Sequence, residues 1–342
     1  MKRSPFAVAF NRRMTSMEKF LLVVIIGYIA VVTVRNPAFL SLETAFDLVR
    51  NGSGVMILAL GTLIILISGG IDVSFTAIAI VAGYSSVLLM REFGIDNLVF
   101  AIGVAAAIGA LLGSVNALLI HFYKLPTLIV TLGTASVFHG SMALLLGMKT
   151  FTRTDVPQSM IALGSTNIIT IQGETSRYGL NIGVLIVIAV IVLTWFLLYR
   201  TMIGRAVFAL GSNEESATRI GLKVLRTRLF IYMYAGGLSG LMGIIYFSNL
   251  AYINPAALVG TELAVIAAVV IGGAKLSGGE GTILGTVLGV ITWTLFQNTL
   301  VFLGLGAAFN GLFFGGVLVV ILCVIYYRQR QSNKRALVFS AS

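Results

Sequence analysis

Residues 281–327, GTILGTVLGVITWTLFQNTLVFLGLGAAFNGLFFGGVLVVILCVIYY, run for 47 positions without a charged side chain. A helix needs about 20 apolar residues to cross the hydrocarbon core of a bilayer, so this stretch has room for two crossings. Gly304-Leu305-Gly306 and Asn310-Gly311 mark the break between them, because glycine and asparagine favour turns. The stretch therefore predicts a helical membrane protein.

The rest of the chain has the same character. Of its 342 residues, 58% are hydrophobic and only 10% are charged, whereas soluble domains carry about 25% charged residues. This composition excludes a soluble enzyme, a disordered chain and a nucleic-acid-binding domain. Further uncharged stretches, bounded by charges, lie at 20–34, 51–71, 73–90, 97–123, 125–148, 178–199, 229–261 and 263–274.

Together these stretches predict an all-α polytopic protein with about ten transmembrane helices. The stretch 263–274 is too short to cross unless its helix begins near Ala256, which would draw Glu262 towards the membrane. With ten spans and the N-terminus inside, 17 of the 23 Lys and Arg residues lie in inward segments. This bias follows the positive-inside rule, so we expect both termini to be cytoplasmic.

The predicted organisation is a single transmembrane domain over 1–342. It has a basic tail at 1–19, a helical bundle at 20–327 and a second tail at 328–342. The only long outward loop, 149–177, contains β-branched residues from Thr166 to Gln172 and favours a short strand or a re-entrant piece. A plain surface loop and a docking loop both remain open. A weak inverted repeat would relate spans 2–5 to spans 7–10, with glycine-rich joints at Ser68-Gly69-Gly70 and Gly272-Gly273.

No motif for bond chemistry occurs in the chain. It lacks the G-x-x-x-x-G-K-[ST], H-E-x-x-H and G-x-S-x-G patterns and any His/Cys/Asp cluster with metal-ligand spacing. We therefore expect no catalytic residue, no metal site and no cofactor held by this chain. Leu276-Ser277-Gly278-Gly279-Glu280 looks like an ATPase signature, but it lies between two apolar runs and favours a tight turn.

The two histidines stand alone. His121 lies at the inner end of span 4, where an interfacial position is the simpler interpretation. His139 lies within span 5 and is more readily explained by a hydrogen bond to a neighbouring helix than by a ligand.

Glycines at a spacing of four predict close helix packing. Gly281, Gly285 and Gly289 form the most convincing stripe, and Gly109/Gly113 and Gly236/Gly240 show the same spacing.

The loop 200–228 faces the cytoplasm in this topology. Ser212-Asn213-Glu214-Glu215 has the form of a capping box, and Gly221 can end a helix in the left-handed conformation. These signals predict two turns of helix from about Asn213 to Ile220. The helix is either an ordinary amphipathic element or a docking element for a cytoplasmic partner.

Few polar residues fall within the spans. Asp72 and Glu262 either cap helix N-termini or mark a solute pathway, since buried acids are costly. Neutral polar side chains either hydrogen-bond a polyhydroxylated solute or join neighbouring helices. Besides the two acids, the candidate pathway residues are Asn116, Thr131, Gln297 and Asn298.

Three of these stretches together resemble a known family, the permease subunits of bacterial ABC importers for ribose and related simple sugars. Residues 68–74 (SGGIDVS) resemble its TGGIDLS segment, 211–221 (GSNEESATRIG) its G-x-N-x-x-A-A-R-x-x-G segment, and 267–281 (AAVVIGGAKLSGGEG) its A-x-V-I-G-G-x-x-L-x-G-G-x-G segment. The match departs at Phe75-Thr76, where Val-Gly is usual, and at Thr218, where a second Ala is common.

The resemblance implies the ABC importer permease fold in the bacterial inner membrane. It also implies a second permease, identical or related, a cytoplasmic ATPase that uses ATP and Mg, and a periplasmic sugar-binding protein. Transport would proceed by alternating access. The family's ATPase-coupling segment falls on Gly211, Asn213, Glu214, Glu215, Arg219 and Gly221.

Other functions remain open on the residues alone. A related importer permease could carry a nucleoside, an amino acid or a signalling furanose instead of a simple sugar. A secondary transporter or channel working alone would use membrane-embedded acids, for which the chain offers only Asp72 and Glu262. A membrane enzyme ranks last, because no nucleophile, base or metal pattern supports it.

Overall fold

The computed structural model describes residues 14–172 and 177–306, together with 309, 311, 312, 315, 316 and 319. Within these residues, eight helical segments are long and apolar enough to cross a membrane: α2 (Ser16–Arg35), α3 (Leu42–Ile67), α4 (Phe75–Glu92), α5 (Leu98–Tyr123), α6 (Thr127–Leu145), α8 (Gly183–Arg200), α11 (Val224–Leu250), and α13 (Ile283–Thr299) continued by η2 (Leu300–Leu303). The expected class, an all-α polytopic membrane protein, is confirmed.

Two of the ten expected spans have no counterpart among these eight. The stretch 263–274 forms α12 (Glu262–Ile271), whose ten residues rise only about 15 Å. The expectation that this helix begins near Ala256 is wrong, because Leu258 and Gly260 have φ of +64° and +88° and break the chain into turns. The last expected span, with Cys323, lies almost wholly outside the described residues, as do the termini.

The first span gains length from a capping box. The Thr15 hydroxyl accepts from the Glu18 backbone N–H, and the Glu18 carboxylate accepts from the Thr15 N–H at 2.7 Å. Helix α2 therefore begins at Ser16, four residues before the apolar stretch, and has the length of a full crossing. Glu18 is buried and also accepts from the Thr282 hydroxyl at 2.7 Å, which fastens α2 to the start of α13.

The centre of the bundle depends on glycine. Helix α11 packs against α3, α4 and α5, and the two predicted glycine pairs face each other across α5 and α11. A Cβ atom on Gly109 would lie 2.1 Å from the Gly236 carbonyl oxygen, and one on Gly113 would lie 2.1 Å from that of Tyr232. Because these glycines have no Cβ, the two helix backbones can come into direct contact.

The stripe in the last described helix packs in the same way. Cβ atoms on Gly285 and Gly289 would each lie 2.0 Å from carbonyl oxygens of α12 and the turn that follows it, those of Gly272 and Ala268. Gly281 differs, because it precedes α13 and faces the side chains of Leu63 and Ile67 rather than a helix backbone. The stripe therefore contains two glycines within the helix, not three.

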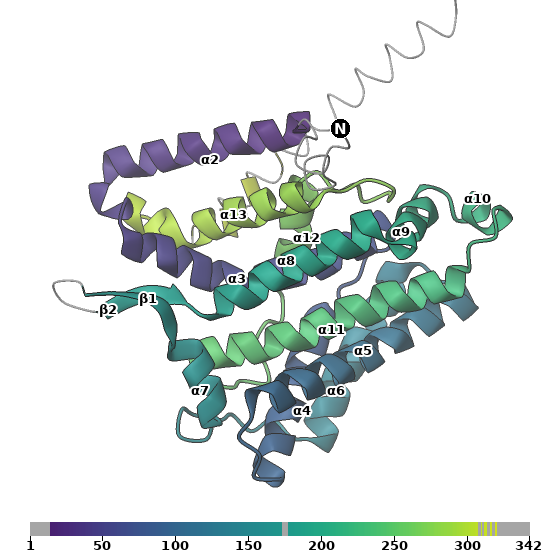
Figure 1. Cartoon of the computed structure of the whole chain (residues 1–342), viewed down its shortest axis with the longest axis horizontal. Helices are drawn as coiled ribbons and strands as arrows, with labels where there is room; N and C mark the ends of the chain where they lie inside the picture. Colours follow the sequence, from purple (N-terminus) through teal and green to yellow (C-terminus); the bar gives the residue numbers. More distant parts are fainter. Residues whose placement is uncertain are drawn as a thin grey trace, which may run out of the picture.

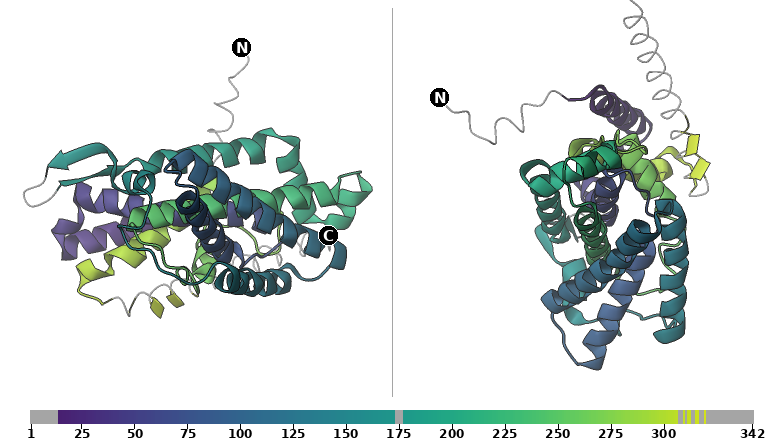
Figure 2. Two further views of the ribbon diagram at one scale, coloured as in Figure 1. Left: turned by 90° about the horizontal axis from the view of Figure 1, so that it is seen from below. Right: turned by 90° about the vertical axis from the view of Figure 1, so that its right-hand side faces the viewer.

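The long helices run roughly side by side, which gives the molecule two distinct ends (Figure 1). One end has β1 (Asn167–Gln172) paired antiparallel with β2 (Arg177–Asn181), and the other has α10 (Glu214–Arg219). The views of Figure 2 show the hairpin projecting beyond the bundle, with α2 and α4–α6 on opposite sides. The predicted strand in the loop 149–177 is confirmed, whereas α7 (Gln158–Ser165) was not predicted.

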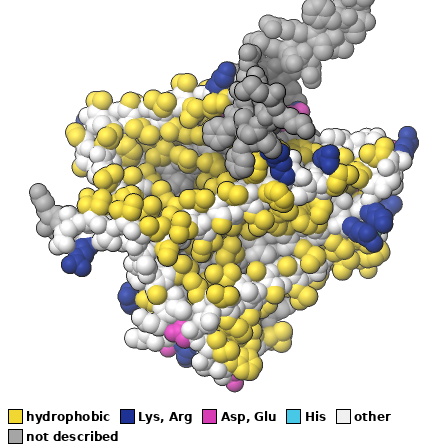
Figure 3. Space-filling view, in the orientation of Figure 1, with side chains coloured by type: hydrophobic (Ala, Val, Ile, Leu, Met, Phe, Trp, Pro, Cys, Tyr) yellow, Lys and Arg dark blue, Asp and Glu magenta, His cyan; other side chains and the backbone are white. Residues whose placement is uncertain are grey.

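The surface agrees with a membrane location. Hydrophobic side chains cover much of the visible face along α8 and α11, and several Lys and Arg side chains gather at the end with α10 (Figure 3). Exposed apolar residues are frequent on α2, α5, α6 and α8, including Val34, Val99, Leu144 and Leu185. The chain is a multi-pass membrane protein whose outer helices present an apolar surface to lipid or to another subunit.

Candidate functional site

Three glycine-rich stretches that are far apart in sequence meet at the end with α10. A Cβ atom on Gly211 would lie 1.7 Å from the Ile67 carbonyl oxygen and 2.8 Å from the Gly279 nitrogen. The Gly279 N–H donates to that same Ile67 oxygen at 2.8 Å. We call this contact of residues 67–70, 211 and 277–279 the glycine junction.

The junction requires glycine for two reasons. Gly69, Gly278 and Gly279 have φ between +79° and +84°, a region that residues with a Cβ rarely adopt. A Cβ on Gly278 would also lie 2.6 Å from the Gly211 carbonyl oxygen. The expectation that the glycines of 276–280 make a tight turn with close packing is confirmed.

The loop 200–228 carries more helix than its sequence predicts. Helix α9 (Met202–Ser212) was missed; its N-cap is Thr201, whose hydroxyl accepts from the Gly204 N–H. Ser212 therefore ends α9 and does not cap α10. The cap is Asn213, whose Oδ1 accepts from the Ser216 N–H at 2.7 Å, so the predicted capping box is wrong.

Helix α10 has six residues and ends as expected. Gly221 adopts φ of +83° and its N–H donates to Thr218, while the Leu222 N–H donates to Ala217. The exposed Glu215 and Arg219 pair across one turn at 2.6 Å. Such a surface pair contributes little stability, so its charges remain available to a partner surface.

A second ion pair joins α10 to the bundle. Arg228 on α11 donates to Glu214 at 2.8 Å, and its other guanidinium nitrogen lies 3.3 Å from His121 Nδ1 on α5. Only 13% of the Arg228 side chain is exposed, against 54% for Glu214. Three elements, α5, α10 and α11, therefore share one partly buried cation, which is less screened by salt than the pair of Glu215 and Arg219.

A cleft of about 920 Å³ opens between α10 and the glycine junction. Its walls include Lys124, Arg219 and Arg228 as well as Glu214 and Glu215. The hydroxyl of Tyr232, a buried residue that also lines the cleft, has no hydrogen-bond partner in the described chain. The cleft thus lies between α10 and the start of the extended segment 70–74.

Segment 70–74 is held by side chains of α6 and by its own acid. The hydroxyls of Thr127 and Thr131 accept from the N–H groups of Ile71 and Val73, at 2.8 and 3.2 Å. Asp72 Oδ1 accepts from both the N–H and the hydroxyl of Ser74, at 2.6 and 2.7 Å. The acid thereby stabilises the turn that leads into α4, but it does not cap that helix, whose N-cap is Ser74 without a side-chain cap bond.

Asn116 completes this polar cluster. Its Nδ2 donates to the Ser74 hydroxyl at 2.7 Å, and its buried Oδ1 has no partner in the described residues. Of the candidate pathway residues, the structure therefore brings Asp72, Asn116 and Thr131 together. Gln297 and Asn298 lie elsewhere, near the opposite end of α13, where Asn298 accepts from Asn51 of α3 at 3.0 Å.

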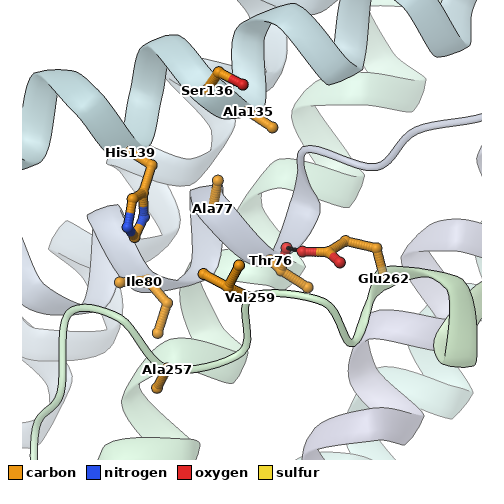
Figure 4. Close-up of a pocket in the computed structure, with 9 residues that line it drawn as sticks. All are labelled: Thr76, Ala77, Ile80, Ala135, Ser136, His139, Ala257, Val259 and Glu262. Atoms are coloured by element: carbon orange, nitrogen blue, oxygen red, sulfur yellow. Dashed lines mark hydrogen bonds between the residues drawn. The ribbon is translucent and has the colours of Figure 1, made fainter.

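Glu262 lies at a second polar position. It is the first residue of α12, and its Oε1 accepts from the Thr76 hydroxyl of α4 at 2.5 Å. Beside this pair is a small pocket, of about 200 Å³, that also includes His139 (Figure 4). The expected hydrogen bond from His139 to a neighbouring helix does not occur in the described structure; the ring faces the pocket instead.

Several residues of this region were not predicted as functional. Arg228 and Tyr232 gave no pattern of their own, because their roles depend on which helix ends meet. His121 was interpreted only as interfacial, although its position at the inner end of a span is the one signal that could have linked it to the loop. Within the described ranges, no three side chains from His, Cys, Asp and Glu gather as a metal site.

Comparison with known families decides the class of protein. A family model described as "Branched-chain amino acid transport system / permease component" matches residues 44–322, which include all three stretches of the glycine junction. The chain belongs to this family. It is therefore a transport permease component, and this membership confirms the resemblance drawn from the sequence.

Individual relatives of this permease are named for solutes other than branched-chain amino acids. A ribose import permease protein of Bacillus subtilis (strain 168) is 34% identical over 309 residues, covering 89% of this chain and 90% of its own. An autoinducer 2 import system permease protein of Enterobacter sp. (strain 638) is 31% identical over 322 residues, covering 92% and 89%. No solved structure matches the chain.

Proposed function

We propose that this permease is the membrane-spanning subunit of an ATP-driven importer for a monosaccharide or a related furanose. Two permease subunits, identical or related, form the passage. A cytoplasmic ATPase binds the end with α10, and a binding protein delivers the solute to the end with the hairpin. The passage opens alternately to the two sides of the inner membrane, and the chain itself performs no bond chemistry.

The observation that carries this proposal is the glycine junction. It places the loop with α9 and α10 in direct backbone contact with residues 67–70 and 277–279. A displacement of α9 and α10 is therefore transmitted to residues 67–70 and 277–279 directly through the backbone, with no flexible side chain between them. A channel that works without a motor has no need for such a connection.

The relatives support the choice of solute, since import permeases for ribose and autoinducer 2 match nearly the whole chain. The polar groups inside the bundle, such as Asn116 and Thr131, suit neutral hydroxyl-rich solutes as well. One observation favours a different solute class: the family model is described by branched-chain amino acid transport.

Purification from native membranes in mild detergent, followed by mass spectrometry, tests the proposal. We expect an ATPase subunit to accompany the permease, and any second permease in the sample identifies a heterodimer. Recovery of this chain alone, active in vesicles that have an ion gradient and no ATP, would instead establish a self-sufficient transporter.

A further inference from the structure

The pocket beside Glu262 lies where two helices begin, on a side of the bundle where the lining residues Ser136 and Val259 are exposed. Helix α4 begins after the extended segment 70–74, and α12 begins after the turns of 251–261. Non-helical backbone at membrane depth is stable only where protein or a water-filled cavity surrounds it. The pocket of about 200 Å³ is bounded by α4, α6 and residues 257–262 (Figure 4).

The polar groups of the pocket leave hydrogen-bonding capacity unused. Glu262 Oε1 accepts from Thr76, while no partner occupies its Oε2 in the described structure. His139 has no hydrogen bond there either, so both its ring nitrogens are free to pair with a ligand. Figure 4 shows Glu262 and His139 towards opposite ends of the pocket, with Thr76 beside Glu262.

The rest of the lining is apolar and small. Ala77, Ile80, Ala135, Ala257 and Val259 form the remaining walls, apart from the hydroxyl-bearing Ser136. Pockets for drug-sized ligands occupy about 300–1,000 Å³, so this smaller one suits a solute of monosaccharide size. Apolar walls with a few hydrogen-bonding groups match the C–H and O–H faces of a sugar ring.

The charge of the pocket disfavours an amino acid. Glu262 can pair with the ammonium group of a zwitterionic solute, but no Lys or Arg lines the pocket to pair with its carboxylate. Helix N-termini can hold such a carboxylate, but here both are already faced by acids. Asp72 accepts from the Ser74 N–H at the start of α4, and Glu262 occupies the first turn of α12.

We infer that this pocket is a solute-binding site for a neutral polyhydroxy compound, with Glu262 and His139 as its hydrogen-bonding residues. The inference rests on the proposed function and specifies where the importer recognises its solute. It separates the sugar alternative from the amino acid alternative by charge.

Uptake into proteoliposomes that contain the complete importer tests the inference, with D-ribose and L-leucine as probes. Glu262→Ala and His139→Ala should each raise the KM for D-ribose at least about tenfold, the effect of one lost hydrogen bond to a charged or strongly polar group. The maximal rate should stay within about twofold, and excess L-leucine should not compete.

Controls separate binding from folding. Glu92→Ala removes an exposed carboxylate at the far end of α4 and should leave KM unchanged. His139→Gln keeps a donor and an acceptor and should recover part of the affinity. All variants should match the wild type in membrane yield and elution volume; if Glu262→Ala does not, His139→Ala carries the test.

The outcomes distinguish the two levels of the argument. An unchanged KM in both Glu262→Ala and His139→Ala would overturn the inference that this pocket binds the solute, and would leave the proposed importer function intact. Uptake of L-leucine in preference to D-ribose would overturn the polyhydroxy class here and the solute named in the proposed function, and would leave the ATP-driven importer intact. Absence of ATP-dependent uptake of either probe would overturn the proposed function, and the inference with it.

Discussion

The two ends of the bundle are joined by different means. At the end with α10, backbone meets backbone: Gly211 contacts the Ile67 carbonyl, and the Gly279 N–H donates to it. At the end with the hairpin, one close backbone contact, of Gly164 with the Ser248 carbonyl (a Cβ on Gly164 would lie 1.9 Å from that oxygen), is combined with a long side chain that reaches across. Arg50 donates to the carbonyls of Gly164 and Asn249, both at 3.0 Å.

This contrast has a mechanical meaning. Backbone contacts without side chains cannot adjust by a rotamer change, so segments joined in this way move as one body. Side-chain clamps such as Arg50 and Arg228 can exchange partners, so they constrain their segments less strictly. The α10 end differs in that three segments of the chain meet in one backbone junction, whereas at the hairpin end the close backbone contact of Gly164 joins only α7 to α11.

The largest expected effect comes from a Cβ in the glycine junction. Gly211→Ala should reduce the folded yield severely, because the new carbon collides with two backbone positions that cannot repack. Overpacking usually costs about 1–3 kcal/mol, and a backbone collision belongs at or beyond the upper limit. Gly27→Ala is the control, since a Cβ there meets nothing within 4 Å. Equal melting temperatures for both variants would contradict the rigid junction.

Charge reversal on α10 separates transport from folding. Glu214→Lys with Glu215→Lys places cations beside Arg228 and Arg219, so both ion pairs become repulsions. We expect normal membrane insertion with loss of ATP-driven uptake and of ATPase co-purification. Full uptake by the double variant would remove the coupling role from this helix. When Arg228→Glu is added to this double variant, an ion pair between position 214 and α11 should form again with reversed charges, whereas the repulsion between position 215 and Arg219 should remain.

Loss of the Arg50 side chain should have an intermediate effect. Arg50→Ala leaves two carbonyls without their charged donor, at a cost of about 3 kcal/mol. The melting temperature of the purified protein should fall while ATPase co-purification persists. The melting temperature of Arg50→Lys should lie between those of the wild type and Arg50→Ala, because an ammonium group lacks the planar fork of the guanidinium. A melting temperature equal to the wild type would show that the clamp is not structural.

The smallest effect concerns pH at the end with the hairpin. Hydrogen bonds from the side chain and then the backbone of Thr152, with a smaller contribution from Arg91, hold the pKa of Asp155 below its ordinary value of 3.8. A lowered pKa stabilises the fold above pH 3.8, and this gain is lost as pH falls through the folded-state pKa. Asp155→Asn should therefore lower Tm slightly at pH 6, with a difference that shrinks in acid.

Glu92→Gln is the matched control for this variant. Glu92 is exposed and has no partner in the described chain, so its substitution should show no such pH dependence. If the difference in Tm between the wild type and Asp155→Asn grew in acid, the lowered pKa of Asp155 would be contradicted.

The sequence predicted much of the architecture from local signals. Uncharged stretches located eight of the described helices, because the bilayer requires a run of about 20 apolar residues. The strand at Thr166–Gln172 and the helix stop at Gly221 followed from β-branched residues and from the left-handed freedom of glycine. These features depend on neighbours in sequence, so a single chain contains the information.

Its errors arose where neighbours in space decide. Helix α12 is short because the positive φ angles of Leu258 and Gly260 prevent the helix from beginning earlier. The composition of residues 256–262 does not reveal these turns. Asn213 rather than Ser212 caps α10, because α9 extends to Ser212. Both outcomes depend on tertiary contacts that fix where one helix ends and the next begins.

By itself, then, the sequence determined that this chain is a membrane protein with many apolar helices and a helical loop on its basic side, and its resemblance to a known family indicated a permease. Hydrophobicity, charge bias and glycine spacing carry that information, since each acts over a few residues. Only the tertiary structure decided that residues 67–70, 211 and 277–279 meet, that Arg228 joins α10 to α5 and α11, and that Glu262 and His139 share a pocket. Those contacts join residues more than 50 positions apart in most cases, and their geometry arises from helix packing that no local pattern encodes.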